Sequence, residues 1–89
     1  MRHKLEVILG DELRSLAINT RERLCLTQRE MGERLHMSES SCSDIETGKN
    51  RSGALTSILI LQMQDDPNEF LKRLEVKFAE LYSSGVQTL

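Results

Sequence analysis

Residues 26–49 carry the clearest structural signals of this chain, and they read LTQREMGERLHMSESSCSDIETGK. Thr27 and Glu30 have the spacing of a capping box, in which each side chain accepts a hydrogen bond from the backbone N–H of the other residue. Ser38 is a second N-cap candidate, because its hydroxyl can accept from a free N–H of a first helical turn. Gly48 suits the position after a helix end, since glycine tolerates a left-handed backbone. The stretch therefore predicts two short helices joined by a tight turn.

Apolar side chains in the same stretch can lock the two helices at a fixed angle. Gly32 lies in the middle of the first helix, where a small residue allows a close approach of the second. Such a pair exposes one face of its second helix, and the major groove of DNA is wide enough to admit that helix. The apolar positions are Leu26, Met31, Leu35, Met37, Cys42 and Ile45.

Three further helices are predicted around this pair. Before it, apolar residues recur every three or four positions over residues 5–24, which indicates one helix that ends near Leu24. After a polar loop over residues 49–53, residues 54–63 are apolar on most sides, so we expect that helix to be central to the core. A last helix over residues 67–82 begins with an aspartate cap and a proline at its first position.

The composition favours a single all-α domain over residues 1–89. Hydrophobic residues make up 38% of the 89 residues and aromatic residues 3%, which suits one domain with a modest core. Leucine, glutamate, arginine and methionine are common, and they favour helices over strands. No signal peptide and no apolar run of membrane-spanning length is visible. We therefore expect a cytoplasmic protein with reduced thiols.

No metal, cofactor or catalytic site is expected. Cys25 and Cys42 lie far apart, without the clustered histidine and cysteine spacing of a zinc site. Cys42 occupies an apolar position of the helix pair, which favours a buried small side chain over a nucleophile. No zinc-protease motif, serine triad or glycine-rich phosphate loop is present. The sequence therefore predicts that the chain is not an enzyme.

With these features, the chain resembles the repressor/Cro-like (Xre) helix-turn-helix family over about residues 13–66. The pattern of that family is Leu-Thr/Ser-Gln-x-x-Leu-Ala, a turn, a serine, and a recognition helix that ends in Ile-Glu-x-Gly-Lys. The resemblance implies an all-α, compact five-helix, lambda-repressor-like DNA-binding domain, with its motif at residues 27–46 and its recognition helix at residues 38–46. The matching residues are Leu26-Thr27-Gln28, Met31-Gly32, Ser38 and Ile45-Glu46-Thr47-Gly48-Lys49.

The resemblance also implies roles for individual residues. The family often pairs an arginine of its first helix with the glutamate of Ile-Glu-x-Gly, and Arg21 and Glu46 stand at these positions, where a bidentate pair would fix the recognition helix. Phosphate contacts position such a domain, whereas base contacts specify the sequence. The DNA-binding residues implied are Gln28 for phosphate and for bracing a recognition side chain, Ser38, Glu39, Ser40, Ser43 and Asp44 on the recognition helix, and Lys49, Asn50 and Arg51 for phosphate after it.

The chain departs from the family pattern in three ways. His36 stands where the turn usually has glycine, and a left-handed backbone there costs histidine roughly 1 kcal/mol. Gly32 replaces an alanine. The recognition helix offers Glu39 and Asp44 but no lysine or arginine, in a chain with a net charge of −2. Carboxylates can accept from cytosine N4 but are repelled by phosphate. The alternatives are therefore that the DNA site contains cytosine at these positions, that DNA binding is weak, or that the recognition helix binds a protein.

Double-stranded DNA is the partner that the resemblance implies, and the predicted function is sequence-specific transcriptional regulation as a repressor. The last helix carries an apolar stripe and is longer than the domain needs. We expect it to end at the sequence Ser83-Ser84-Gly85 and to build a homodimer interface with Phe78, Leu81 and Tyr82. A two-fold dimer would place two recognition helices about 34–36 Å apart, one turn of DNA.

The alternative is a protein-interaction module, such as an antitoxin or an anti-repressor. In that case the acidic recognition helix or the aromatic last helix binds another protein. A protein partner that copurifies in fixed ratio, together with indifference to DNA, would distinguish this class from a DNA-binding regulator.

Overall fold

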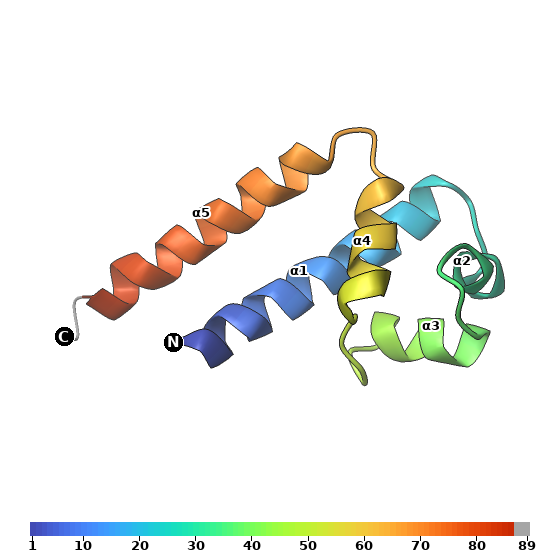
Figure 1. Cartoon of the computed structure of the whole chain (residues 1–89), viewed down its shortest axis with the longest axis horizontal. Helices are drawn as coiled ribbons and strands as arrows, with labels where there is room; N and C mark the ends of the chain where they lie inside the picture. The colour runs from blue at the N-terminus through green and yellow to red at the C-terminus, as the bar shows by residue number, and fades with distance from the viewer. Residues whose placement is uncertain (87–89) are drawn as a thin grey trace.

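The computed structural model describes residues 1–86, which form five α-helices and no strand within that range. The all-α, five-helix prediction is confirmed (Figure 1). None of the described helices is both long enough and apolar enough to cross a membrane. The helices are α1 (Arg2–Arg23), α2 (Gln28–Arg34), α3 (Glu39–Glu46), α4 (Ala54–Gln62) and α5 (Pro67–Val86).

The long helix α1 runs through the length of the molecule and organises the other four. Figure 1 shows α5 beside it in the opposite direction, so that the start of α1 and the end of α5 lie at the same end. The pair α2 and α3 lies at the other end, and α4 crosses α1 between them. The surface predicted to bind DNA is thus remote from the end of α5.

Both predicted caps of the central helix pair are confirmed. The Glu30 backbone N–H donates to Thr27 Oγ1 at 3.1 Å, and the Thr27 N–H donates to Glu30 Oε1 at 2.9 Å. At the start of α3, the Ser41 N–H donates to Ser38 Oγ at 3.1 Å. Gly48 follows the end of α3 with a φ of +82°, a left-handed conformation suited to glycine. The sequence thus fixes where these helices begin and end.

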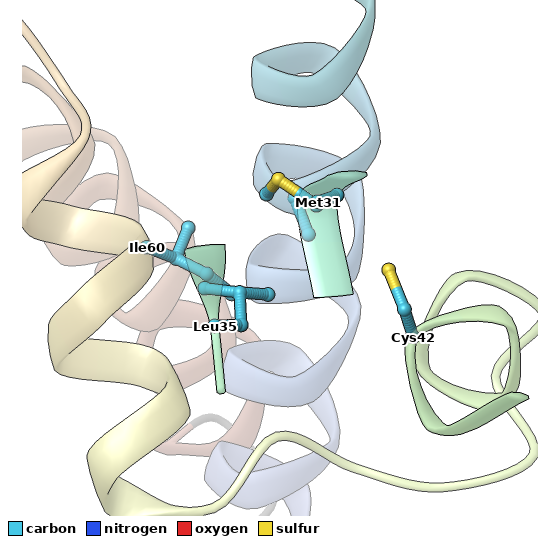
Figure 2. Close-up of a cluster of buried hydrophobic side chains, with 5 residues drawn as sticks. Met31, Leu35, Cys42 and Ile60 are labelled. Atoms are coloured by element: carbon cyan, nitrogen blue, oxygen red, sulfur yellow. The ribbon is translucent and has the colours of Figure 1, made fainter. Parts of the chain in front are cut away.

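A small apolar core joins α1 to the central pair and to α4. Met31 and Ile60 are fully buried, and Ala17, Leu35 and Cys42 complete the cluster. Figure 2 shows Leu35 and Ile60 side by side, with the Cys42 sulfur pointing from α3 towards Met31. Full burial of one such side chain stabilises the fold by about 1.5–3 kcal/mol, so this cluster holds the central pair against α1.

The structure corrects two expectations about the second half of the chain. The prediction that α4 is central to the core is wrong for most of its surface, because only Ile60 is buried while Leu55 and Ile58 are 66% and 53% exposed. An apolar residue pattern cannot tell whether the covering surface belongs to the same chain. In addition, α5 continues to Val86 instead of ending at residues 83–85, because serine and glycine weaken a helix by about 1 kcal/mol or less each without excluding it.

Candidate nucleic-acid interface

The turn between α2 and α3 is built around Gly32 and His36. The Met37 N–H donates to the Gly32 carbonyl oxygen at 2.9 Å, and His36 adopts a φ of +58°. A Cβ added at Gly32 would lie 2.8 Å from the Met37 carbonyl oxygen, closer than side chains are tolerated. The predicted close approach at Gly32 is confirmed, and the backbone of the turn itself is what approaches. Gly32 therefore lowers the helix propensity of α2 but allows the tight turn between α2 and α3 to form.

An ion pair fixes the end of α3 to α1, as predicted. Arg21 donates from Nε to Glu46 Oε2 at 2.7 Å and from Nη2 to Glu46 Oε1 at 3.0 Å, a bidentate arrangement. Only 7% of the Glu46 side chain and 22% of the Arg21 side chain are exposed. The hydrogen bond from Arg21 to Glu46 raises the pKa of the guanidinium. Partial burial and paired geometry make this contact stronger than an ordinary surface ion pair.

Two further side chains and one carbonyl complete the network around this pair. Gln28 Nε2 donates to Glu46 Oε1 at 3.2 Å, and Arg21 Nη1 donates to the Leu26 carbonyl oxygen at 3.1 Å. The Cys42 sulfur lies 3.9 Å from Glu46 Oε2. Burial is the main cause that raises the pKa of the Cys42 thiol, so Cys42 is a core side chain, as predicted. The network ties together α1, α2 and α3, and Gln28, which was expected to brace a recognition side chain, contacts Glu46 at the end of α3.

The predicted base-reading residues occupy two different environments. Glu39 and Ser40 are exposed on the outer side of α3, and Ser38 caps the helix at its exposed start. Ser43 and Asp44 are half-buried. The outer face near the start of α3 is therefore the free part of the helix, while its last turn lies closer to the rest of the molecule.

The loop after α3 folds back onto the protein. The Asn50 backbone N–H donates to the Asp44 carbonyl oxygen at 3.1 Å, and Asn50 Nδ2 donates to Asp44 Oδ2 at 3.4 Å. Arg51 points to the first half of α1, where its Nη1 lies 3.8 Å from Glu6 Oε2. Lys49 is exposed. The structure thus keeps these three residues in one loop but gives Asn50 and Arg51 partners within the chain.

Positive charge near α3 comes from its neighbours. Lys49 and Arg51 lie in the loop after α3, and α2 adds the exposed side chains of Arg29 and Arg34, which sequence reasoning did not select. The signal that could have found them is periodicity, because both positions fall outside the buried positions of α2. Arg29 Nε lies 3.7 Å from Glu33 Oε1, and its side chain is 78% exposed, so it remains available to an anion.

Residues 8–57, more than half of the chain, match the family described as a helix-turn-helix domain. The matched range contains α2, α3, the turn at Gly32 and both residues of the Arg21–Glu46 pair. The chain belongs to the helix-turn-helix domain family. This membership agrees with the resemblance to the repressor/Cro-like family. No curated protein and no solved structure matches the chain.

Membership in the helix-turn-helix domain family supports DNA as the partner. In such domains the second helix of the pair lies in the major groove, with its first residues against the base edges. The second helix of the pair in this chain is α3, and its first residues are the exposed Glu39 and Ser40. The family is one of binding domains and is typically without enzymatic activity.

Proposed function

We propose that this helix-turn-helix domain is a sequence-specific, DNA-binding transcriptional repressor that occupies its operator as a homodimer. The observation that carries the proposal is the bidentate contact between Arg21 and Glu46, at 2.7 and 3.0 Å, beneath an exposed outer face of α3. A recognition helix must present its side chains in a fixed orientation, and this partly buried pair provides that orientation without using the outer face.

The environments of the α3 side chains divide the proposed DNA contacts. Glu39 is exposed near the start of α3, where its carboxylate can accept from the N4 amino group of cytosine. Ser40 can donate to or accept from either base of a pair. Asp44 is half-buried and already accepts from Asn50, so it contributes less to base reading than Glu39. Gln28, Lys49 and Arg51 supply phosphate contacts around this centre.

Selection of binding sites from random duplexes tests the proposal directly. We expect the wild-type chain to enrich a defined sequence with cytosine in each half-site, and footprinting to protect that sequence. Glu39→Ala should lose about 1–3 kcal/mol of discrimination at one base pair. Glu22→Ala removes the same charge from an exposed position of α1 and serves as the matched control. Failure to enrich any sequence would refute sequence-specific binding.

A protein-interaction module, such as an antitoxin or an anti-repressor, is the second candidate. It is favoured by one observation: α3 carries Glu39 and Asp44 but no lysine or arginine, and the whole chain has a net charge of −2. A basic partner protein would find this face complementary. Copurification of such a partner in fixed ratio, by a chain that enriches no DNA sequence, would establish the alternative.

A further inference from the structure

Two adjoining hollows lie where the loop after α3 meets α1. An open apolar groove of about 520 Å³ lies between α1, α4 and α5, and a smaller polar pocket of about 180 Å³ lies between α1, α3 and the loop. Gly10, Arg51 and Ser52 line both hollows, so the groove and the pocket meet at these three residues. The volume of the groove falls within the range of about 300–1,000 Å³ that is typical of small-molecule sites.

The groove offers an apolar surface that the chain itself does not cover. Leu13 and Phe70, which are 4% and 6% exposed, form its buried floor, and the partly exposed Leu9 stands at its side. Removing apolar surface of this kind from water favours binding of an apolar group. The groove is therefore suited to an alkyl chain.

Two arginines give the polar pocket a positive charge. The stem of Arg51 lies on Gly10, where an added Cβ would be 3.7 Å from its Cγ and Cδ, and the stem of Arg14 lies on Gly48, where a Cβ would be 3.7 Å from its Cδ. Among the described residues, Arg14 forms no ion pair within 4 Å. The pocket lining holds these two arginines and one aspartate, Asp11, which leaves a net charge of +1.

Glu6 also lines the groove, and its carboxylate is held mainly by a different residue. Arg2 Nε lies 3.0 Å from Glu6 Oε1, whereas Arg51 Nη1 lies 3.8 Å from Glu6 Oε2. The contact with Arg51 is long and half-exposed, so breaking it costs little free energy. Arg51 can therefore turn to an anion while Glu6 keeps its contact with Arg2.

The hydroxyl of Ser52 points to a ligand at the same place. Ser52 Oγ is buried and has no hydrogen-bond partner among the described residues. A buried hydroxyl without a partner is unfavourable and calls for an explanation. Ser57 lines the same groove, but its Oγ donates to the Gly53 carbonyl oxygen at 2.8 Å. Ser52 is thus the lining hydroxyl that an oxygen atom of a ligand would satisfy.

We propose that the groove and the pocket together bind a single-chain amphipathic carboxylate. Its alkyl chain lies in the groove, and its carboxylate accepts from Arg14, Arg51 and the Ser52 hydroxyl. A carboxylate matches the paired N–H groups of a guanidinium. A neutral head group would leave the positive pocket without a counter-charge, and a small inorganic anion would leave the apolar groove unfilled.

The proposed ligand also has a consequence for DNA binding, because Arg51 is one of the proposed phosphate contacts. The guanidinium of Arg51 cannot hold the ligand carboxylate and a DNA phosphate in the same orientation. The ligand should therefore lower the affinity for DNA, and DNA should lower the affinity for the ligand by the same factor. This coupling rests on the proposed function, whereas ligand binding itself does not.

Calorimetric titration of the full chain without DNA tests the ligand class. We expect decanoate, below its micelle-forming concentration, to bind with one molecule per chain. Decanol has the same alkyl chain and acetate the same head group, and each should bind at least about tenfold more weakly. Equal binding of decanol would overturn carboxylate recognition, and equal binding of acetate would overturn the groove. A chain that binds no decanoate would overturn the proposal altogether and leave the groove to a protein partner.

Two serine variants test the role of the unsatisfied hydroxyl. Ser52→Ala should raise the dissociation constant of decanoate about tenfold, because a donor to a charged group is lost, and should leave decanol binding unchanged. Ser57→Ala is the matched control, since its hydroxyl already has a partner, and it should bind decanoate like the wild type. A merely structural Ser52 would give equal decanoate binding in both variants, which would overturn its assignment.

Variants of the two hollows locate the chain and the head group. Leu9→Glu should weaken decanoate binding about 100-fold, because the new carboxylate lies in the apolar groove. Leu24→Glu is its control, since both leucines are 37% exposed but Leu24 lines neither hollow. Arg14→Gln should weaken binding about tenfold, whereas Arg29→Gln removes the same charge outside both hollows and should not. Unchanged helical circular dichroism would show that the variants fold, and equal effects within either pair would overturn the site.

The coupling is measured with the duplex that the wild-type chain enriches. Saturating decanoate should lower the affinity for this duplex about five- to tenfold, and it should have no such effect on Arg51→Ala, which has already lost the contact. An unchanged affinity in the presence of bound decanoate would overturn the coupling. A chain that binds decanoate but enriches no DNA sequence would refute the proposed function while leaving the ligand site intact.

Discussion

Gly32 shows how a single hydrogen in place of a side chain sets the geometry of the helix pair. Alanine in the middle of a helix is normally about 1 kcal/mol more stable than glycine. At residue 32, however, a Cβ would lie 2.8 Å from the Met37 carbonyl oxygen and 3.2 Å from the Ser38 carbonyl oxygen. Backbone atoms cannot yield as a flexible side chain can, so the turn would have to open.

We therefore predict that Gly32→Ala destabilises the protein by about 1–2 kcal/mol, because the strain of overpacking exceeds the gain in helix propensity. Gly10→Ala is the matched control, since Gly10 also lies within a helix but a Cβ there would meet only Arg51 side-chain atoms at 3.7 Å. Urea unfolding should show Gly10→Ala to be neutral or stabilising. Equal effects of the two substitutions would contradict the close approach at Gly32.

Arg51 tests the proposed phosphate contacts. Its ion pair with Glu6 is long, at 3.8 Å, and the side chain is 55% exposed, so little stability holds it away from DNA. We predict that Arg51→Ala weakens binding evenly across DNA sequences and reduces the slope of log K against log salt by about 1.

Arg2→Ala is the control for Arg51→Ala, because it removes the same charge from a side chain that is 93% exposed and also pairs with Glu6. It should leave both the DNA affinity and the salt slope unchanged. A change of sequence preference in Arg51→Ala would instead place Arg51 at the bases.

At the scale of the element, α2 depends on its ends. It has seven residues, far fewer than the 12–15 or so that an isolated helix needs in water. The capping box at Thr27 and the burial of Met31 therefore decide whether this helix forms. The hydrogen bond from the Thr27 backbone N–H to Glu30 also lowers the pKa of the Glu30 carboxyl group.

A lowered pKa in the folded state means that the Glu30 carboxylate stabilises the protein at neutral pH. That contribution declines as the pH falls through the folded-state pKa. We predict that the melting temperature of the wild type exceeds that of Glu30→Gln at neutral pH and approaches it in acid. Glu33→Gln, which changes an exposed residue of the same helix, is the control. Its difference in melting temperature from the wild type should change less between neutral and acid pH. A constant difference across this pH range would show that the cap does not depend on the Glu30 charge.

The elements also show which features follow from local sequence. Thr27, Glu30 and Ser38 were predictable because a cap satisfies backbone groups within three residues of itself. The Arg21–Glu46 pair spans 25 positions, and only the family resemblance pointed to it. The Asp44–Asn50 contacts were not predicted, because a side chain that can contact DNA can equally bond to its own loop, and the loop conformation decides between them. For the same reason, the DNA contacts of Gln28, Ser38, Glu39, Ser40, Ser43, Lys49 and Arg51 remain predictions.

At the scale of the whole molecule, the division between core and interface could not be predicted. Residues 54–63 and 67–82 were correctly predicted as helices because their periodicity and caps are local. Their apolar surface exceeds what the described chain buries, and an apolar stripe looks the same in sequence whether its neighbour belongs to the same chain or to another. Ile58 and Leu71 are examples, because both belong to apolar patterns in the sequence and both are exposed in the structure.

If a second copy covers this surface, the stability of the fold depends on protein concentration. We predict that the melting temperature of the wild type rises with concentration, because association stabilises the folded state by mass action. The melting temperature of Ile58→Glu should be lower and nearly independent of concentration. A wild-type melting temperature that does not change with concentration would contradict a dimer-stabilised fold.

The unbroken course of α1 has a consequence for DNA recognition. Its 22 residues reach from the end of the molecule remote from α3 to Arg21, which holds α3, so no hinge separates the two ends. In the proposed homodimer, α1 would therefore set the spacing and the rotational phase of the two DNA half-sites. One residue inserted between Leu13 and Ala17 would shift α2 and α3 by about 1.5 Å along the axis of α1 and rotate them by about 100° about it. The continuous helix has no flexible joint that could compensate for this displacement.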